Sequence, residues 1–330
     1  MISVVVPVYN EEEIIPILHD AVAQAMSGLR DSWEVVYVND GSRDSSLTLL
    51  RTLQSNDSHI VIVDLSRNWG HMGAISAGLK TARGNAVVLM DGDLQDPPEV
   101  VPELVDAWRR GAQVVTAVRR SRQEKRKALA LLFPLFYRLL GALSDFPIPL
   151  NAGIFGLLDR QAVDAINGLQ EGNRYLPGLR AWVGYRTSVV YYDRNDRVGG
   201  EGKLSFISRI KYAMDAITSF SYKPLRFSFV LAGLVMCASV GFAISALVSA
   251  GPVNSMAFAM TAAVFFVGSL LLFSAGIMGE YIGRVYDEVR RRPLSLVAKV
   301  YEAESEYRVL PIAVKSNGQG TDLERISPAV

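Results

Sequence analysis

The chain has 330 residues, and its 34 Lys and Arg nearly balance its 33 Asp and Glu, giving a formal net charge of +1. A net charge this close to zero says little about binding partners, and we expect no nucleic acid among them. Half of the residues are hydrophobic and the mean hydropathy is +0.20, which is high for a purely soluble protein. The single cysteine, Cys237, excludes an internal disulfide.

The first 120 residues alternate short β-rich runs with helical patterns. Strands are expected at 2–7, 35–39, 60–65, 86–90 and 114–118, and helices at 14–25, 45–53, 70–82 and 98–110. This alternation predicts an α/β domain with a mostly parallel sheet and helices on both faces.

Polar segments follow four of the expected strands, beginning at Pro7, Asn39, Leu65 and Asp91. The carboxyl ends of parallel strands line the crevice where open α/β sheets bind ligands, so we expect these segments to converge. The last of them contains two carboxylates one residue apart, Asp91 and Asp93, whose hard oxygens suit Mg²⁺ or Mn²⁺. Such an ion keeps positions open for phosphate oxygens, and the sequence therefore predicts a metal–diphosphate site. The alternative is an ordinary solvated turn.

Neither a G-x-G-x-x-G after the first strand nor a G-x-x-x-x-G-K-[ST] occurs, so a dinucleotide fingerprint and a P-loop are unsupported. Basic residues cluster between Arg119 and Lys127 and precede an apolar helical stripe at 129–143. A second stripe lies at 204–220. Both stripes either pack on the sheet or lie in a membrane interface, and we expect the interfacial placement.

Two segments without charged residues, 227–249 and 251–279, are each long enough to cross a bilayer. They predict a membrane hairpin with helices at about 227–249 and 256–279; the alternative is two buried helices of a soluble core. Lys and Arg flank the pair but are absent from its connecting loop, so both termini are expected in the cytoplasm. The chain thus divides into a cytoplasmic domain at 1–225, two spans within 226–280 and a cytoplasmic tail at 281–330.

In combination, these motifs resemble the family 2 glycosyltransferases of GT-A fold. Within that family the chain looks like a polyisoprenyl-phosphate glycosyltransferase, similar to bacterial undecaprenyl-phosphate glucosyltransferases and dolichyl-phosphate mannose synthase. The segments that carry the resemblance are Pro7-Val8-Tyr9-Asn10-Glu11, Asn39-Asp40-Gly41-Ser42, Leu65-Ser66-Arg67-Asn68-Trp69-Gly70-His71 and Asp91-Gly92-Asp93-Leu94-Gln95-Asp96-Pro97-Pro98. The expected architecture is a GT-A (Rossmann-like) sheet domain with interfacial amphipathic helices and a two-helix transmembrane hairpin.

The resemblance implies inverting transfer of a hexose from a nucleotide sugar, with UDP-glucose as the expected donor, to a polyisoprenyl phosphate. The reaction would take place at the cytoplasmic face of a bacterial inner membrane and use Mg²⁺ or Mn²⁺. Membrane lipid and further copies of the chain are expected partners. Nucleotide-sugar binding is implied for Pro7, Tyr9, Glu11, Asp40, Asp91 and Gln95, and metal binding for Asp91, Asp93 and Gln95.

For the acceptor phosphate we expect Arg119 and Arg122 from the basic cluster, which could bind it bidentately. Arg197 and Lys203 join them from a segment that partly matches a family loop closing over the donor. The segment 151–160 departs from the pattern of many relatives, and Asp159 is its remaining acidic candidate. Asp93 and Asp159 are therefore the expected catalytic residues.

Two other functions compete with this interpretation. A processive polysaccharide synthase of the same fold would need more membrane spans and a Q-x-x-R-W segment, which the chain lacks. A non-catalytic membrane subunit could retain the fold, but the intact Asp91 and Asp93 argue against it.

Overall fold

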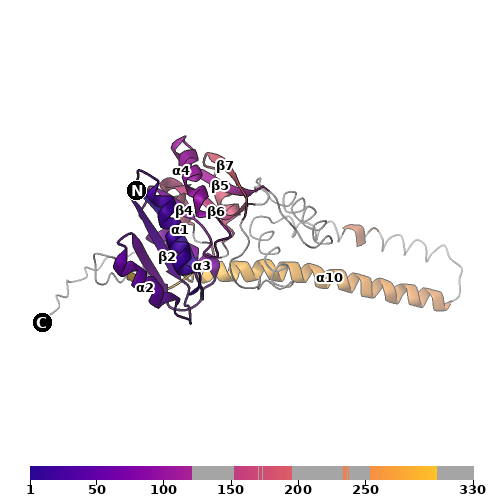
Figure 1. The fold of residues 1–330 in the computed structure, drawn as a ribbon. Helices are drawn as coiled ribbons and strands as arrows, with labels where there is room; N and C mark the ends of the chain where they lie inside the picture. The colour runs from indigo at the N-terminus through magenta and orange to yellow at the C-terminus, as the bar shows by residue number, and fades with distance from the viewer. Residues whose placement is uncertain are drawn as a thin grey trace, which may run out of the picture.

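The computed structural model describes residues 1–120, 152–169, 171–172, 174–194, 233–235, 237 and 253–302. Its centre is an eight-stranded sheet in the order β7-β5-β6-β4-β1-β2-β3-β8 (Figure 1). The strands are β1 Ile2–Val8, β2 Trp33–Asn39, β3 Ile60–Leu65, β4 Ala86–Leu89, β5 Val114–Arg119, β6 Ala152–Asp159, β7 Thr187–Tyr192 and β8 Val297–Tyr301. The helices are α1 Ile15–Ser27, α2 Ser46–Asn56, α3 His71–Thr81, η1 Pro98–Val100, α4 Val101–Arg109, α6 Arg160–Gly168, α7 Leu176–Trp182 and α10 Val253–Arg290.

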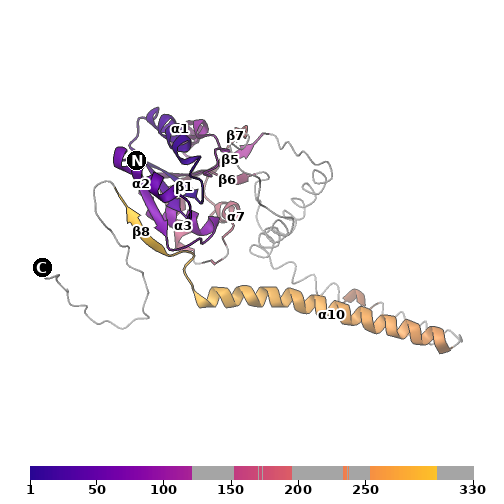
Figure 2. The same cartoon turned by 60° about the horizontal axis from the view of Figure 1, so that its bottom comes forward.

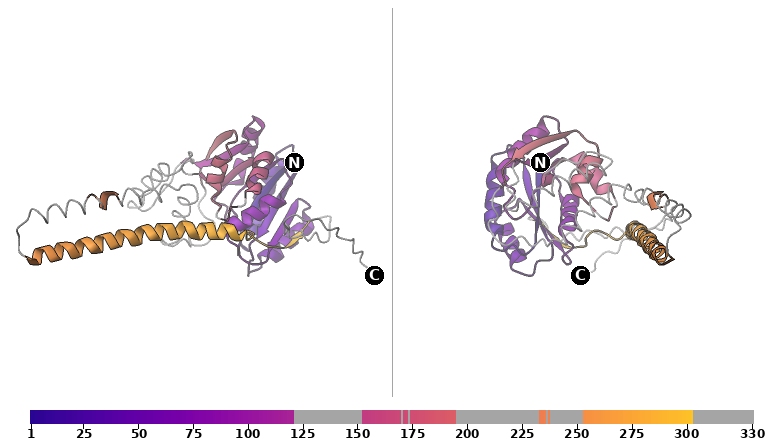
Figure 3. Two further views of the ribbon diagram at one scale, coloured as in Figure 1. Left: turned by 180° about the vertical axis from the view of Figure 1, so that it is seen from behind. Right: turned by 90° about the vertical axis from the view of Figure 1, so that its right-hand side faces the viewer.

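Four neighbouring strands, β4, β1, β2 and β3, run parallel to one another, so their carboxyl ends meet at one edge. Their cores are nearly continuous runs of Val and Ile, as expected for strands covered on both faces. One face carries α1, α2 and α4, and the opposite face carries α3, α6 and α7 (Figure 3). Successive residues alternate between these layers, as Val4 and Val5 do.

The five expected strands and four expected helical segments are confirmed, and their ends differ from the expected ones by at most three residues. The last of these segments divides into a 3₁₀ turn, η1, and the helix α4, whose first turn contains Pro102. Proline fits a first helical turn because the N–H it lacks would have no intrahelical partner there.

The sequence patterns did not reveal β6, β7 and β8. β6 lies antiparallel between β4 and β5, and β8 lies antiparallel to β3 at the sheet edge. Both therefore break the simple βα alternation. The C-terminal segment thus contributes a strand to the N-terminal sheet, directly after α10 (Figure 2).

The helix α10 projects far out of the sheet domain and has 38 residues. Its part from Phe266 to Arg290 is long and apolar enough to cross a membrane, and its most apolar stretch is not buried against the rest of the protein. The other expected span, 227–249, lies almost wholly outside the described residues, so the two-helix hairpin is not confirmed. The stripes at 129–143 and 204–220 also lie outside them.

The end of α10 is joined closely to the sheet. Arg291 follows it with a left-handed φ of 49°, and the chain then turns toward β8. Ser66, directly after β3, donates its backbone N–H to the carbonyl of Leu296 at 2.9 Å. The segment between α10 and β8 therefore contacts the loop between β3 and α3.

Candidate active site

The polar segments after β1 and β2 form one hydrogen-bonded unit. Asn10 N–H donates to Ser42 Oγ at 3.0 Å, and Arg43 N–H donates to Asn10 Oδ1 at 2.8 Å. Glu11 N–H donates to Ser46 Oγ at 3.0 Å. Asn10 has a left-handed φ of 53°, a conformation that its short polar side chain tolerates. The loop carrying Tyr9 and Glu11 is thus fixed by the loop that follows β2.

Asp40 joins the second loop to the third. Its buried side chain accepts a hydrogen bond from the backbone N–H of Trp69 through Oδ1 at 2.6 Å. Burial raises the pKa of Asp40, although the backbone N–H groups of Trp69 and Gly70 partly oppose the shift. Gly41 has a φ of 64°, and a Cβ there would lie 2.4 Å from the carbonyl carbon of Arg67. Only glycine permits this approach of the two loops.

Asp91 follows β4 and faces a histidine from the start of α3. His71 Nε2 lies 3.2 Å from Asp91 Oδ1. The His71 side chain is 45% exposed, and burial of the rest acts to lower the pKa of the imidazole. The contact with Asp91 and the negative charges of Asp40 and Asp93 outweigh burial, so the net pKa of His71 is raised. Burial raises the pKa of Asp91, but His71 and the positive charges of Arg194 and Arg119 outweigh it, so the net pKa is lowered. Asp91 is therefore held as a carboxylate.

The second carboxylate is fixed by a local turn. The backbone N–H of Gln95 donates to Asp93 Oδ1 at 3.2 Å, and Leu94 between them has a left-handed φ of 57°. Leu94 is an apolar residue in a strained conformation, and its side chain is buried in the core. The core thus holds the turn, and with it Asp93 and Gln95, at the end of β4.

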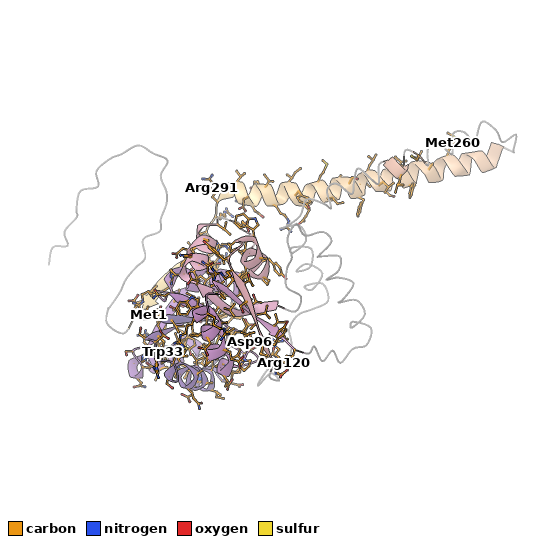
Figure 4. All side chains as sticks on the ribbon, turned by 90° about the horizontal axis from the view of Figure 1, so that it is seen from above. Met1, Trp33, Asp96, Arg120, Met260 and Arg291 are labelled. Atoms are coloured by element: carbon orange, nitrogen blue, oxygen red, sulfur yellow. The ribbon has the colours of Figure 1, made fainter. Side chains whose placement is uncertain are left out.

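A third acidic residue of this segment, Asp96, is almost completely buried, with 1% exposure. Its Oδ1 accepts a hydrogen bond from Tyr192 Oη at 2.7 Å, and Arg119 Nε donates to the same Tyr192 oxygen at 3.2 Å. Figure 4 shows Asp96 near Arg120, the residue after Arg119, at the end of the sheet domain distant from Arg291. The ends of β4, β5 and β7 therefore meet at one place.

A divalent metal ion fits the residues at the end of β4. Apart from its contact with His71, Asp91 Oδ1 is buried and accepts no hydrogen bond from a described residue. Among the described residues, no three His, Cys, Asp or Glu side chains converge as a metal site. The chain would then supply Asp91 and Asp93, and substrate phosphate oxygens would complete the shell, as is usual for Mg²⁺.

The structure does not bring Asp159 to this crevice. Asp159 pairs in register with Ala86 at the amino end of β4, whereas Asp91 follows the carboxyl end, roughly 17 Å away. Its Oδ1 accepts the N–H of Gln161 at the start of α6, and its Oδ2 accepts the indole N–H of Trp108. The first contact caps α6 and the second joins Asp159 to α4, so Asp159 has a structural role, which corrects the expectation of a catalytic one.

The remaining expected site residues divide into two groups. Pro7 lies in β1, Tyr9 is 42% exposed beside the crevice loops, and Glu11 and Asp40 belong to the linked loops described above. Arg122, Arg197 and Lys203 lie outside the described residues. The sequence prediction did not assign roles to His71, Asp96, Tyr192 and Arg194. Asp96 stands within the quoted motif, whereas pairing of β7 with β5 was needed to find Tyr192.

Comparisons with known proteins point to one family. Residues 3–166 match the model of the family described as Glycosyl transferase family 2, and residues 223–285 match the GtrB C-terminal hairpin. The chain is 40% identical over 306 residues to an uncharacterized glycosyltransferase of Synechocystis, covering 92% of this chain and 96% of that protein. It is 38% identical to a prophage-derived bactoprenol glucosyl transferase of Shigella flexneri, covering 90% of this chain and 97% of the relative.

A solved structure with a similar fold is the mannosyltransferase PcManGT from Pyrobaculum calidifontis, determined in complex with GDP-mannose and Mn²⁺. The TM-score is 0.50 at 18% sequence identity, and the alignment covers 87% of each chain. This likeness concerns the fold, whereas the identity of the curated relatives establishes descent. The chain belongs to the family 2 glycosyltransferases and is a glycosyltransferase itself.

Proposed function

We propose that this enzyme transfers glucose from UDP-glucose to a polyisoprenyl phosphate of the undecaprenyl type, with inversion at the anomeric carbon. The observation that carries the proposal is that the carboxylate of Asp91, after β4, lies within electrostatic reach of the Arg119 guanidinium at the end of β5. Bactoprenol glucosyl transferases 37–38% identical to this chain support glucose as the sugar and a lipid acceptor.

The donor would bind across the carboxyl ends of β1, β2 and β4. The nucleoside would be held by Pro7, Tyr9, Glu11 and Asp40. The loops that carry these residues are already fixed to one another by hydrogen bonds, so the site would need little rearrangement on binding. Asp91, Asp93 and Gln95 would hold Mg²⁺ or Mn²⁺ against the diphosphate. When bound, this ion offsets the charge that develops on the departing nucleoside diphosphate.

The acceptor would bring its own nucleophile. A phosphate monoester has a second pKa of about 6, so it is largely dianionic at neutral pH and needs no strong general base. It does need cations that overcome its repulsion from the donor diphosphate. Arg119 would bind it bidentately, and Arg122, Arg197 and Lys203 remain candidates for the same role.

The lipid acceptor places the reaction at a membrane. The exposed apolar part of α10 supports a membrane-spanning role, and the match to the GtrB C-terminal hairpin covers both expected spans. We propose an integral protein of the bacterial inner membrane with its sheet domain and both termini in the cytoplasm. Self-association through the spans stays a prediction.

The experiment that tests this function is transfer of radiolabelled glucose from UDP-glucose into the lipid phase. Membranes containing the protein would receive undecaprenyl phosphate with Mg²⁺ or Mn²⁺, and GDP-mannose would serve as the alternative donor. We expect metal-dependent label in the lipid, reduced about a thousandfold or more in Asp93→Ala, since the metal supplies several kcal/mol.

The matched control is Asp106→Asn, which neutralises an exposed carboxylate on α4 that contacts Arg109. This variant should transfer glucose at the wild-type rate. Label in a long water-insoluble polymer would instead indicate a processive synthase. Label from GDP-mannose alone would contradict the proposed donor, and label in neither lipid nor polymer would contradict the proposed reaction.

A further inference from the structure

The buried carboxyl of Asp96 has no part in the mechanism described so far. It lies three residues after Asp93 with 1% exposure, and among the described residues it accepts a hydrogen bond from the hydroxyl of Tyr192. Burial and the neighbouring charge of Asp91 raise its pKa, while Tyr192 and Arg119 oppose the shift. Burying an acidic group costs free energy unless the group is hydrogen-bonded or paired, so the bond to Tyr192 matters for this carboxyl.

The donors and acceptors of this cluster allow only one direction. A guanidinium nitrogen can only donate, so Tyr192 Oη must accept from Arg119 Nε. The single hydroxyl proton of Tyr192 is then left for Asp96 Oδ1, at 2.7 Å. Asp96 therefore sets the orientation of the phenol hydroxyl, and the hydroxyl sets the position of the Arg119 side chain.

The backbone supports the same arrangement. Arg119 and Tyr192 are register partners in the parallel strands β5 and β7, so their side chains leave the same face of the sheet. The Phe155 ring packs edge-on against the Tyr192 ring, with centroids 5.2 Å apart and an interplanar angle of 85°. The phenol is thus held by packing as well as by hydrogen bonds.

Within the described part of the chain, Arg119 is held through its Nε. Among the described residues, its terminal nitrogens make no hydrogen bond, and its Nη2 lies 3.4 Å from the position of a Cβ on Gly153. These two nitrogens form the edge of the guanidinium that binds a phosphate bidentately. Gly153, which has no side chain, leaves this edge uncovered on the side of β6.

We propose that Asp96 and Tyr192 are positioning residues that hold the Arg119 guanidinium in the orientation that binds the acceptor phosphate. The inference rests on the proposed function, because it takes the phosphate of the lipid acceptor as the group that Arg119 binds. Neither Asp96 nor Tyr192 touches the substrate. Since Asp96 belongs to the same segment as Asp91 and Asp93, the cluster also links the donor side of the crevice to the acceptor side.

The test is steady-state kinetics of the full-length protein in undecaprenyl-phosphate-containing vesicles with UDP-glucose. Tyr192→Phe keeps the ring and removes the hydroxyl, so we expect the KM for undecaprenyl phosphate to rise about tenfold. The KM for UDP-glucose should change less than about twofold. Asp96→Asn should give a smaller rise in the acceptor KM, because an amide oxygen can still accept from Tyr192.

Two neighbouring variants serve as matched controls. Tyr191→Phe removes a hydroxyl from the adjacent, 58% exposed tyrosine, and Asp106→Asn removes a charge from α4. Both should leave both KM values unchanged. Introducing Tyr192→Phe into Arg119→Ala should cause no further rise in the acceptor KM, because the residue through which Tyr192 acts is already absent.

The outcomes separate this inference from the proposed function. A Tyr192→Phe variant that weakens donor and acceptor equally, or whose effect persists in full in Arg119→Ala, would overturn the positioning role. So would an unchanged acceptor KM in Tyr192→Phe. A wild type that transfers no glucose to undecaprenyl phosphate would overturn the proposed function and this inference together.

Discussion

The donor half and the acceptor half of the crevice are organised by different means. In the donor half, backbone N–H groups of one loop bond to side chains of the next, from Asn10 through Ser42 to Asp40 and Trp69. In the acceptor half, Arg119, the proposed phosphate-binding arginine within the described residues, depends on a chain of two side chains, Tyr192 and Asp96. The donor site is therefore built largely by backbone placement, and the acceptor site by side-chain placement.

This difference has a consequence for substitutions. A loop held by several backbone hydrogen bonds tolerates the loss of one side chain but not a change in backbone conformation. When a guanidinium is oriented by one hydroxyl, removing that hydroxyl leaves the backbone in place but releases the orientation of the side chain. Changes of the main chain should therefore be most damaging in the donor half.

The largest effect is expected for Gly41→Ala. The added Cβ would meet the backbone of Arg67 at 2.4 Å in a residue with a φ of 64°. Left-handed strain and overpacking together should lower the free energy of unfolding by about 2–4 kcal/mol. Thermal unfolding in detergent and calorimetric titration with UDP should both show the loss.

Gly70→Ala is the matched control for this prediction. Gly70 also has a left-handed φ, of 81°, but no atom lies within 4 Å of an added Cβ. Its ψ of 163° places Gly70 in a region that is nearly restricted to glycine, so backbone strain of about 1–3 kcal/mol should remain, without overpacking. Equal losses in the two variants would show that contact between the second and third loops does not organise the donor site.

An intermediate effect, which depends on pH, is expected for Asp40→Asn. The amide oxygen can still accept from Trp69 N–H, while the cost of burying a charge disappears, so stability at pH 7 should not fall. The folded-state pKa of Asp40 is raised, so its contribution to stability is fully present below the unfolded value of about 3.9 and is lost as pH rises through the folded pKa.

Urea unfolding at several pH values measures this dependence. The wild type should gain stability relative to Asp40→Asn as the pH falls toward about 4. UDP binding by the variant at pH 7 should nevertheless weaken, because the proposed contact with the nucleoside uses the charge. A variant that is less stable than wild type at pH 7 would mean that the carboxylate stabilises the loops.

The smallest effect is expected for Asp193→Asn, on the acceptor side. Asp193 pairs with Arg120 at 3.3 Å, but both side chains are more than 60% exposed. Exposed ion pairs contribute about 0–1 kcal/mol, so thermal unfolding should barely change. A large loss of acceptor binding here would show that surface charge, rather than the buried Tyr192 and Asp96, organises the acceptor half.

The same two halves differ in how far the sequence predicted them. The strands β1 to β4 and the D-x-D motif follow from local patterns, because hydrophobic runs and the turns after them are adjacent in the chain. The Arg119–Tyr192 contact joins residues 73 positions apart and depends on the pairing of β5 with β7. The prediction for Asp159 failed for the same reason. Its place in the sequence suggested a catalytic role, but Asp159 ends β6 beside Ala86, at the amino end of β4 and away from the crevice.

The short connection from α10 to β8 sets the height and the orientation of the crevice relative to the bilayer. In α10 the uncharged part ends at Gly279, and about three charged helical turns, 280–290, followed by residues 291–296, separate that part from β8. Those turns amount to roughly 16 Å of height. Each residue inserted there would raise the sheet by about 1.5 Å and rotate it by about 100° around the helix axis. The number of residues in this part of the helix thus sets the direction that the crevice faces. Two added residues would turn the crevice away from the lipid, whereas seven, about two full turns, would restore its direction.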